Sequence, residues 1–145
     1  MSQKITSLKK QNKIDKLYLR MAQTWAENSP AVRNKVGCLI VNNRTIISDG
    51  YNGTPSGFPN ICEDENNKTL PTVLHAEANA ITKIAKSTNN SEGATLYVTL
   101  SPCFDCAKLI IQSGIKRVVY SEKYRNTDSF KLFEEAGIQL DQVII

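Results

Sequence analysis

The chain has 145 residues, a formal net charge of +4 and four cysteines, with 41% hydrophobic and 22% charged residues. This length suits one compact domain, and the composition is that of a globular rather than a disordered chain. No apolar run approaches the ~20 residues of a membrane span, and the N-terminus lacks the apolar block of a signal peptide. We therefore expect a cytoplasmic protein with no membrane partner, whose cysteines are thiols or metal ligands.

The first part of the chain predicts a tail followed by a helix. Residues 1–12 are polar and rich in lysine, and we interpret them as a frayed lead-in to a single domain of residues 13–145. Apolar residues then recur in steps of three and four, which predicts a helix over 13–28. Its apolar face comprises Ile14, Leu17, Tyr18, Met21, Ala22 and Trp25. We expect this face to be core, although Trp25 and its neighbours are also candidates for a subunit interface.

The middle of the chain predicts a hairpin, a loop and a second helix. Residues 36–42 and 45–51 are rich in β-formers and flank a short polar turn, which favours an antiparallel hairpin. The run GYNGTPSG at 50–57 is dense in turn formers and predicts an ordered loop. A helix is expected to begin after residues 71–72 and to run to about Lys86.

The remaining segments alternate between strand and helix. Ser101 suits an N-cap and Pro102 the first turn of a helix that Gly114 would end. Strands are predicted at 94–99, 116–121 and 139–144, and a helix at 128–136. A strand, short helix and strand in succession imply a parallel crossover. The whole order predicts an α/β fold of three layers, with a mixed five-stranded sheet and helices on both faces.

Two short motifs carry the chemistry. The single histidine, His75, precedes Glu77 by two residues, and Cys103 and Cys106 follow Pro102. The N-terminus of a helix lowers thiol pKa and so favours the thiolates that a metal needs. One histidine and two cysteines make three ligands for tetrahedral zinc, which leaves a position for a water whose pKa the metal brings near ~7.

Each motif has an ordinary reading when taken alone. A His-x-Glu pair arises by chance, and a Cys-x-x-Cys pair also suits a redox site or half of a structural zinc site. On a helix, His75 and Glu77 would diverge by about 200°, so they share a site only if His75 lies at the very start of the helix. In that arrangement Glu77 suits a proton shuttle better than a fourth ligand.

The motifs in this order resemble the zinc deaminase signature, His-x-Glu followed by Pro-Cys-x-x-Cys. From about residue 15 to about residue 140 the chain resembles the cytidine deaminase superfamily, and most of all the deoxycytidylate (dCMP) deaminases, including those of bacteriophages. The resemblance lies in HAEANAI at 75–81, TLSPCFDCA at 99–107 and the GYNGTPSG run. That glycine-rich run points to dCMP rather than to free cytidine or tRNA. The resemblance implies a cytidine deaminase-like fold.

The resemblance also implies an activity, the hydrolytic deamination of dCMP to dUMP and ammonia, which supplies dUMP for thymidylate synthesis. The zinc ligands would be His75, Cys103 and Cys106, with Glu77 as the catalytic proton shuttle. Many relatives carry a second, structural zinc. Here Ala31 replaces one of its cysteines, Cys62 stands alone and no further histidine exists, so we expect one zinc ion per chain.

The substrate residues follow from the same resemblance. Arg33 occupies the place of the arginine that binds the 5′-phosphate, for which a guanidinium fork is suited, and Tyr124 is a second phosphate candidate. Asn52 would hydrogen-bond the deoxyribose, and Ala76 and Ser101 also belong to the implied substrate site. The alternative, which we favour less, is that Arg33 is only a solvated surface charge.

Similar enzymes are regulated oligomers. They are activated by dCTP with Mg²⁺ and inhibited by dTTP, and we expect a homo-oligomer, with a hexamer favoured. The implied effector residues are Gly50, Tyr51, Gly53, Thr54 and Gly57, whose backbone amides could approach a triphosphate. The alternative is that this run is only a structural turn.

Two rival functions remain open. A tRNA or single-stranded DNA deaminase would use a basic groove and aromatic platforms, whereas aromatic residues are only 7% here and the lysines gather at the N-terminus. We therefore expect no polynucleotide partner. A zinc-stabilised binding module without catalysis would need neither Glu77 nor the glycine-rich run.

Overall fold

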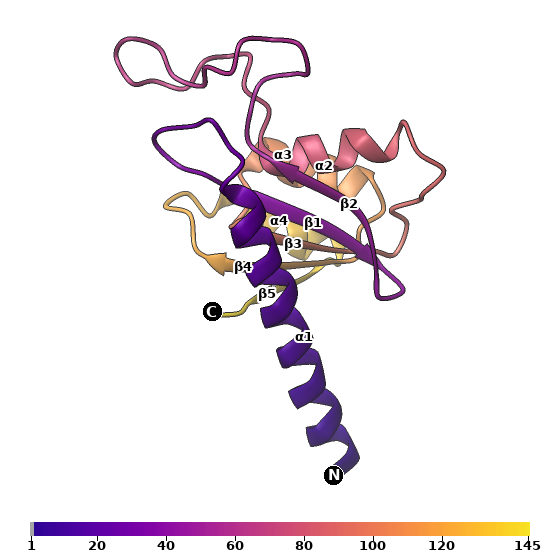
Figure 1. Cartoon of the computed structure of the whole chain (residues 1–145). Coiled ribbons are helices and arrows are strands. Elements are labelled where there is room, and N and C mark those ends of the chain that lie inside the picture. Colours follow the sequence, from indigo (N-terminus) through magenta and orange to yellow (C-terminus); the bar gives the residue numbers. More distant parts are fainter. Residues whose placement is uncertain (1) are drawn as a thin grey trace.

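A mixed five-stranded sheet forms the middle layer of the protein, with strand order β2-β1-β3-β4-β5 (Figure 1). The computed structural model describes residues 2–145, apart from the side chains of Ser2 and Ile5. Strand β1 runs antiparallel to β2 and β3, whereas β3, β4 and β5 are parallel. The strands are β1 (Gly37–Asn42), β2 (Thr45–Tyr51), β3 (Thr95–Leu100), β4 (Arg117–Glu122) and β5 (Gln139–Gln142). The helices are α1 (Ser2–Ala26), α2 (Ala76–Ile84), α3 (Phe104–Gln112) and α4 (Asp128–Ala136).

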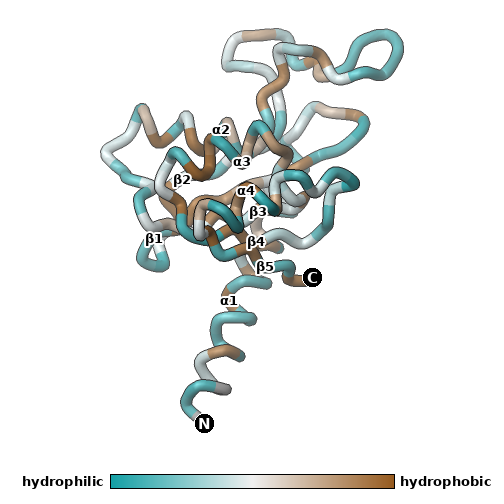
Figure 2. The backbone as a smooth tube through the Cα atoms, turned by 180° about the vertical axis from the view of Figure 1, so that it is seen from behind, coloured by the Kyte–Doolittle hydropathy of each residue, from teal (hydrophilic) through white to brown (hydrophobic). Residues whose placement is uncertain are grey.

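The predicted fold class is confirmed, because helices cover both faces of this sheet. Alternate residues of each strand point to opposite faces. In β1, Cys38 and Ile40 pack beneath α2, α3 and α4, whereas Leu39 and Val41 pack against α1. The apolar segments gather at the strands when the chain is coloured by hydropathy (Figure 2). Among the helices of the described chain, none combines the length and apolar character that a membrane span requires.

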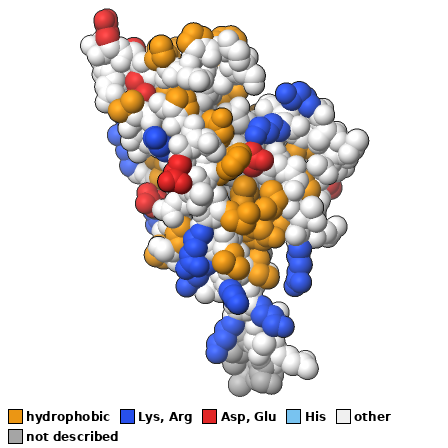
Figure 3. Space-filling view, viewed as in Figure 1, with side chains coloured by type: hydrophobic (Ala, Val, Ile, Leu, Met, Phe, Trp, Pro, Cys, Tyr) orange, Lys and Arg blue, Asp and Glu red, His pale blue; other side chains and the backbone are white. Residues whose placement is uncertain are grey.

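Helix α1 is longer than the sequence pattern indicates. The expectation of a frayed lead-in at residues 1–12 is wrong for the part that the structure describes, because the helix already begins at Ser2. Lysine, glutamine and leucine are good helix formers, and a helix nucleated over its docked half extends at little further cost. The helix ends at Ala26, two residues before the predicted end. Its N-terminal half projects from the body of the protein, and Lys and Arg side chains gather around it (Figure 3).

The buried face of α1 differs from the predicted one. Leu17, Met21 and Trp25 are 46%, 47% and 39% exposed, whereas Leu19 and Ala22 are fully buried. The prediction that the Leu17–Met21–Trp25 stripe packs in the core is therefore wrong. The helix is rotated because its docked face includes a buried carboxylate that the apolar pattern could not reveal.

That carboxylate belongs to Asp15, which anchors α1 to the sheet. Arg117 of β4 donates two hydrogen bonds of 2.9 Å to Asp15, and the Tyr97 hydroxyl donates a third of 2.7 Å. Burial alone would raise the pKa of Asp15, but the hydrogen bonds from Arg117, Tyr97 and Gln11 outweigh it and lower the pKa. Arg117 also bonds Asp141 of β5 at 2.9 Å, so one guanidinium ties α1 to two strands.

Candidate active site

The two ligand motifs lie at the beginnings of two helices, each in the N-cap position. His75 precedes α2 with φ −70° and ψ 158°, and Cys103 precedes α3 with φ −75° and ψ 172°. The Cys103 Sγ accepts a hydrogen bond of 3.5 Å from the Cys106 amide, which holds both cysteines at the start of α3. The prediction that Ser101 caps α3 is wrong. Its amide donates to the Glu122 carbonyl at 2.8 Å, so Ser101 continues the pairing of β3 with β4.

The N-cap position of His75 resolves the geometric difficulty of the His-x-Glu motif. Because the backbone of His75 is extended, the angular separation of helical residues does not apply to this pair. Glu77 lies in the first turn of α2, is 4% exposed and lines the same pocket as His75. Burial raises the pKa of Glu77 to about 7, in the range that suits a group that both accepts and donates a proton.

Strand β2 sets the position of α2. A Cβ at Gly50 would collide with the backbone carbonyl of Ala76 and would lie 2.8 Å from the Ala80 amide nitrogen, so only glycine allows α2 to approach this closely. The Ser48 hydroxyl donates to the Ala80 carbonyl at 2.6 Å, and the Asn79 side chain donates to the Tyr51 carbonyl at 2.8 Å. Gly50, which the resemblance placed among the effector residues, is thus a packing residue buried beneath α2.

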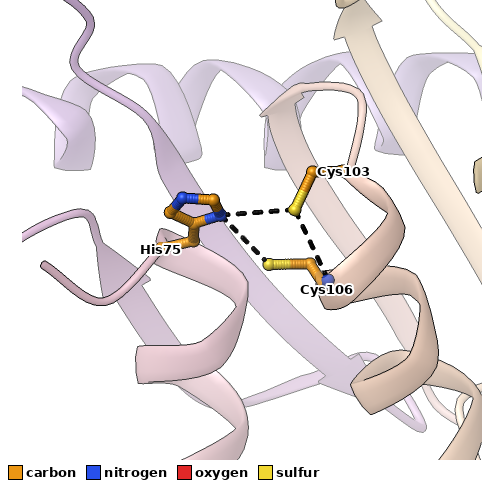
Figure 4. A group of neighbouring side chains, drawn as sticks. All are labelled: His75, Cys103 and Cys106. Carbon is orange, nitrogen blue, oxygen red and sulfur yellow. Dashed lines mark hydrogen bonds between the residues drawn. The ribbon is translucent and has the colours of Figure 1, made fainter. Parts of the chain in front are cut away.

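Three side chains converge where α2 and α3 begin (Figure 4). The Nδ1 of His75 lies 3.4 Å from the Cys103 Sγ and 3.3 Å from the Cys106 Sγ. The hydrogen bond with Cys106 lowers the pKa of Cys103 to about 4, and the hydrogen bond with Cys103 raises the pKa of His75. One sulfur is therefore already poised as a thiolate beside an imidazole.

This donor set fits zinc. Thiolate and imidazole are the ligands that Zn²⁺ prefers, and the three ligand atoms lie within 4.8 Å of one another. The described residues contribute three such atoms to the cluster, which is the number typical of catalytic rather than structural zinc sites. A bound zinc ion would thus be held by His75, Cys103 and Cys106.

A cavity of about 160 Å³ opens beside this cluster, and His75 and Cys103 line it. All five residues that the resemblance assigned to substrate line it, together with Glu77. They are Arg33, Asn52, Ala76, Ser101 and Tyr124. The cavity thus joins the candidate metal centre to an arginine and a tyrosine that come from other parts of the chain.

Asn52 already supports the backbone at the arginine end of this cavity. Its Oδ1 accepts from the Val36 amide at 2.8 Å, and its Nδ2 donates to the Asn34 carbonyl at 2.8 Å. A bond from Asn52 to a deoxyribose would use the remaining lone pair or amide hydrogen. The predicted substrate contact of Asn52 stays a prediction.

Tyr124 is fixed at the cavity by its backbone. Its amide donates to the Ser101 hydroxyl at 2.7 Å, which couples the segment after β4 to the end of β3. The Arg125 guanidinium lies 5.8 Å from the centre of the Tyr124 ring, a cation–π distance. Arg125 thus lies beside a residue that lines the cavity, although it does not line the cavity itself.

A long loop, residues 53–74, leaves the body of the protein next to the site and projects from it (Figure 1). Gly53 and Leu74 exchange two backbone hydrogen bonds, of 3.0 and 2.8 Å, which close the loop at its base immediately before His75. Thr54 and Gly57 lie on the outgoing side of the loop, where Gly57 has a φ of 90°. Within the described chain, none of the five predicted effector residues lines the cavity.

Sequence reasoning missed the contribution of this loop to the cavity. Glu63, Thr69 and Val73 line it, although residues 58–70 show no periodic pattern. Cys62, predicted to be a thiol left from a second zinc site, is buried and also lines the cavity. No local signal could have indicated the place of Glu63, because its carboxylate contacts Val32 and Arg33, which lie about 30 positions earlier in the chain.

Comparisons of the sequence and of the fold with known proteins all find cytidine or deoxycytidylate deaminases. A family model described as the cytidine and deoxycytidylate deaminase zinc-binding region matches residues 12–122. The chain is 37% identical over 138 residues to a Saccharomyces cerevisiae deoxycytidylate deaminase, covering 88% of this chain and 44% of the yeast protein. It is 34% identical to the deoxycytidylate deaminase of Enterobacteria phage T4, covering 86% of this chain and 87% of the phage protein. The structure of the dCMP deaminase of cyanophage S-TIM5 with dCMP and dUMP superposes with a TM-score of 0.87 at 43% identity, covering 90% of this chain and 96% of that one.

Proposed function

This chain belongs to the cytidine and deoxycytidylate deaminase family, and we propose that it hydrolyses dCMP to dUMP and ammonia with one zinc ion per chain. One observation carries the proposal: a single cavity joins the His75–Cys103–Cys106 cluster and Glu77 to Arg33. The end of the cavity with the ligand cluster and Glu77 suits hydrolysis of a nucleobase, and the end with Arg33 suits a phosphate.

The proposed reaction consumes one water molecule and exchanges the amino group at C4 of cytosine for oxygen. When bound, the zinc ion supplies a water that is activated at neutral pH. As the water oxygen bonds to C4, Glu77 accepts one of its protons and delivers it to N3 of the ring. When the C4–N bond breaks, Glu77 transfers the second proton of the water, from the new hydroxyl at C4, to the amino group, which leaves as ammonia. Its burial beside His75 keeps competing solvent away from the proton being moved.

The other cavity residues bind and orient the nucleotide. Arg33 holds the 5′-phosphate and Tyr124 assists it, while Asn52 contacts the deoxyribose. Ala76 lies in the first turn of α2, where backbone amides have no partner within the helix and can donate to the base. Ser101 also lines the cavity and would border the base. The product, dUMP, would feed the synthesis of thymidylate.

The substrate assignment predicts a selective effect of replacing Arg33. Arg33→Ala is expected to lower kcat/KM for dCMP about thirtyfold, because a charge-assisted phosphate contact contributes about 2 kcal/mol. Deoxycytidine lacks the phosphate, so its slow turnover should be unchanged. Ammonia release from dCMP, dCTP, deoxycytidine, cytidine and a cytosine-containing oligonucleotide measures both effects.

Lys35→Ala is the matched control, since it removes another exposed positive charge two residues away, outside this cavity. Faster turnover of the oligonucleotide than of dCMP by the unmodified protein would overturn the substrate assignment. An equal loss with dCMP and deoxycytidine in Arg33→Ala would remove the phosphate role of Arg33 alone.

We also propose that the enzyme is a regulated homo-oligomer, with a hexamer favoured. The exposed apolar side chains of Leu17, Met21 and Trp25 on α1 supply a surface that a second subunit could cover. Activation by dCTP with Mg²⁺ and inhibition by dTTP would act through residues 51–57, whose glycine backbone suits a triphosphate.

Regulation predicts a change in the shape of the rate curve. The dependence of rate on dCMP concentration should be sigmoidal and become hyperbolic when dCTP and Mg²⁺ are added, because an effector that favours one state shifts the population toward it. Addition of dTTP should lower the rate at subsaturating dCMP. Initial rates measured across a dCMP series provide the check, and indifference to both nucleotides would refute the proposal.

A further inference from the structure

The carboxylate of Glu63 binds the backbone of the segment that carries Arg33. Its Oε2 accepts from the Val32 amide at 3.0 Å and from the Arg33 amide at 3.1 Å, and its Oε1 lies 3.2 Å from the Val32 amide. Hydrogen bonds from amides to a charged acceptor are stronger than those between neutral groups. Glu63 thus joins the 53–74 loop to a segment 30 residues earlier in the chain.

The loop holds Glu63 in place by its own backbone. The Leu70 amide donates to the Cys62 carbonyl at 2.8 Å, and the Asp64 amide donates to the Lys68 carbonyl at 2.8 Å. These bonds form a short antiparallel pairing around Glu63, and Cys62 beside it is only 2% exposed. The carboxylate therefore projects from a fixed base and not from a freely moving loop tip.

The segment that receives these bonds lacks regular structure of its own. Residues 31–36 lie between α1 and β1 and form neither helix nor strand. Asn52 fixes the second half of this segment through Asn34 and Val36. Glu63 fixes the first half, through the amides of Val32 and Arg33. Because Arg33 itself is exposed, the position of its backbone decides where its guanidinium can reach.

We propose that Glu63 is a positioning residue, whose carboxylate fixes the Val32–Arg33 backbone so that Arg33 can bind the 5′-phosphate of the nucleotide. This inference rests on the proposed function, in which Arg33 makes that contact. A carboxylate that merely lined a phosphate-binding cavity would repel the ligand. Glu63 does line the cavity, but its carboxylate accepts hydrogen bonds from two backbone amides, which offset part of its charge.

The test compares nucleotide with nucleoside in Glu63→Gln. This isosteric change removes the charge and one acceptor oxygen. We expect KM for dCMP to rise about tenfold with kcat changed less than twofold, and kcat/KM for deoxycytidine to be unchanged. Glu65→Gln is the matched control, because it removes the same charge from an exposed position on the same loop and should alter neither substrate. Zinc content and the thermal midpoint are measured on each variant.

A double variant separates positioning from a general structural role. Once Arg33 is replaced by alanine, Glu63→Gln should change KM for dCMP less than twofold, because the two residues act through one contact. Equal losses with dCMP and deoxycytidine, an additive effect in the double variant, or a KM for dCMP that is unchanged or lower in Glu63→Gln would each overturn the inference. The preference of the unmodified protein for dCMP over deoxycytidine is measured first, before any variant is made. If there is no such preference, the proposed function is wrong, and this outcome is distinct from a failure of the Glu63 inference.

Discussion

Replacing Glu77 with glutamine is expected to lower kcat for dCMP by roughly 10²–10⁴-fold, the contribution typical of a positioned proton-transfer group. Glutamine retains the size of the side chain but cannot carry the proton from water to the ring. Because the ligand cluster consists of His75, Cys103 and Cys106, the zinc content should stay near one ion per chain. Steady-state kinetics and elemental analysis of the same preparation measure the two quantities.

Two outcomes would contradict the assignment of Glu77. Activity retained in Glu77→Gln would show that another group moves the proton. Loss of zinc in the variant would show that Glu77 serves as a ligand instead. The exposed Glu65→Gln change controls for the loss of one negative charge.

Cys106→Ser is expected to abolish zinc binding and, with it, turnover of dCMP beyond detection. A serine hydroxyl is a poor zinc ligand, and two remaining protein ligands do not hold the ion. The variant should also unfold at a lower temperature, because an ion bound only by the folded protein stabilises it. Elemental analysis, ammonia release and thermal unfolding before and after chelation measure the three effects.

Cys62→Ser is the matched control for Cys106→Ser. It makes the same substitution at another buried cysteine that lies beside the cavity but outside the ligand cluster. This variant should retain one zinc ion per chain and most of the activity. A loss of zinc in Cys62→Ser, or more than one ion per chain in the unmodified protein, would contradict the single-metal expectation.

The ligand cluster could be predicted from the sequence because residue type and spacing together specify its chemistry. Few combinations of one histidine and two cysteines suit anything other than a soft metal ion, and the structure brings these three together. How His75 and Glu77 reach one cavity could not be predicted from spacing. It depends on the N-cap position of His75, and thus on the residue at which α2 begins. Helix boundaries are the least certain result of pattern reasoning.

Helix α1 shows a different limit of pattern reasoning. The apolar stripe through Leu17 and Met21 predicted the buried face, yet Asp15 is buried and those two are exposed. The outcome was decided by Arg117, which lies about a hundred residues away and makes a buried carboxylate favourable. A periodic pattern cannot reveal a partner that lies so far away in the chain. For the same reason it could not reveal that Glu63 binds the amides of Val32 and Arg33.

The hydrogen bonds between Gly53 and Leu74 close the 53–74 loop at its base, and they separate the residues of the loop from His75 and the chemical step. Residues inserted or deleted beyond this closure need not displace His75, and the entropy of a longer loop grows only slowly with its length. Recognition of the phosphate end of the nucleotide can therefore diverge through changes within this loop, while the chemical step stays with the residues at the start of α2 and α3.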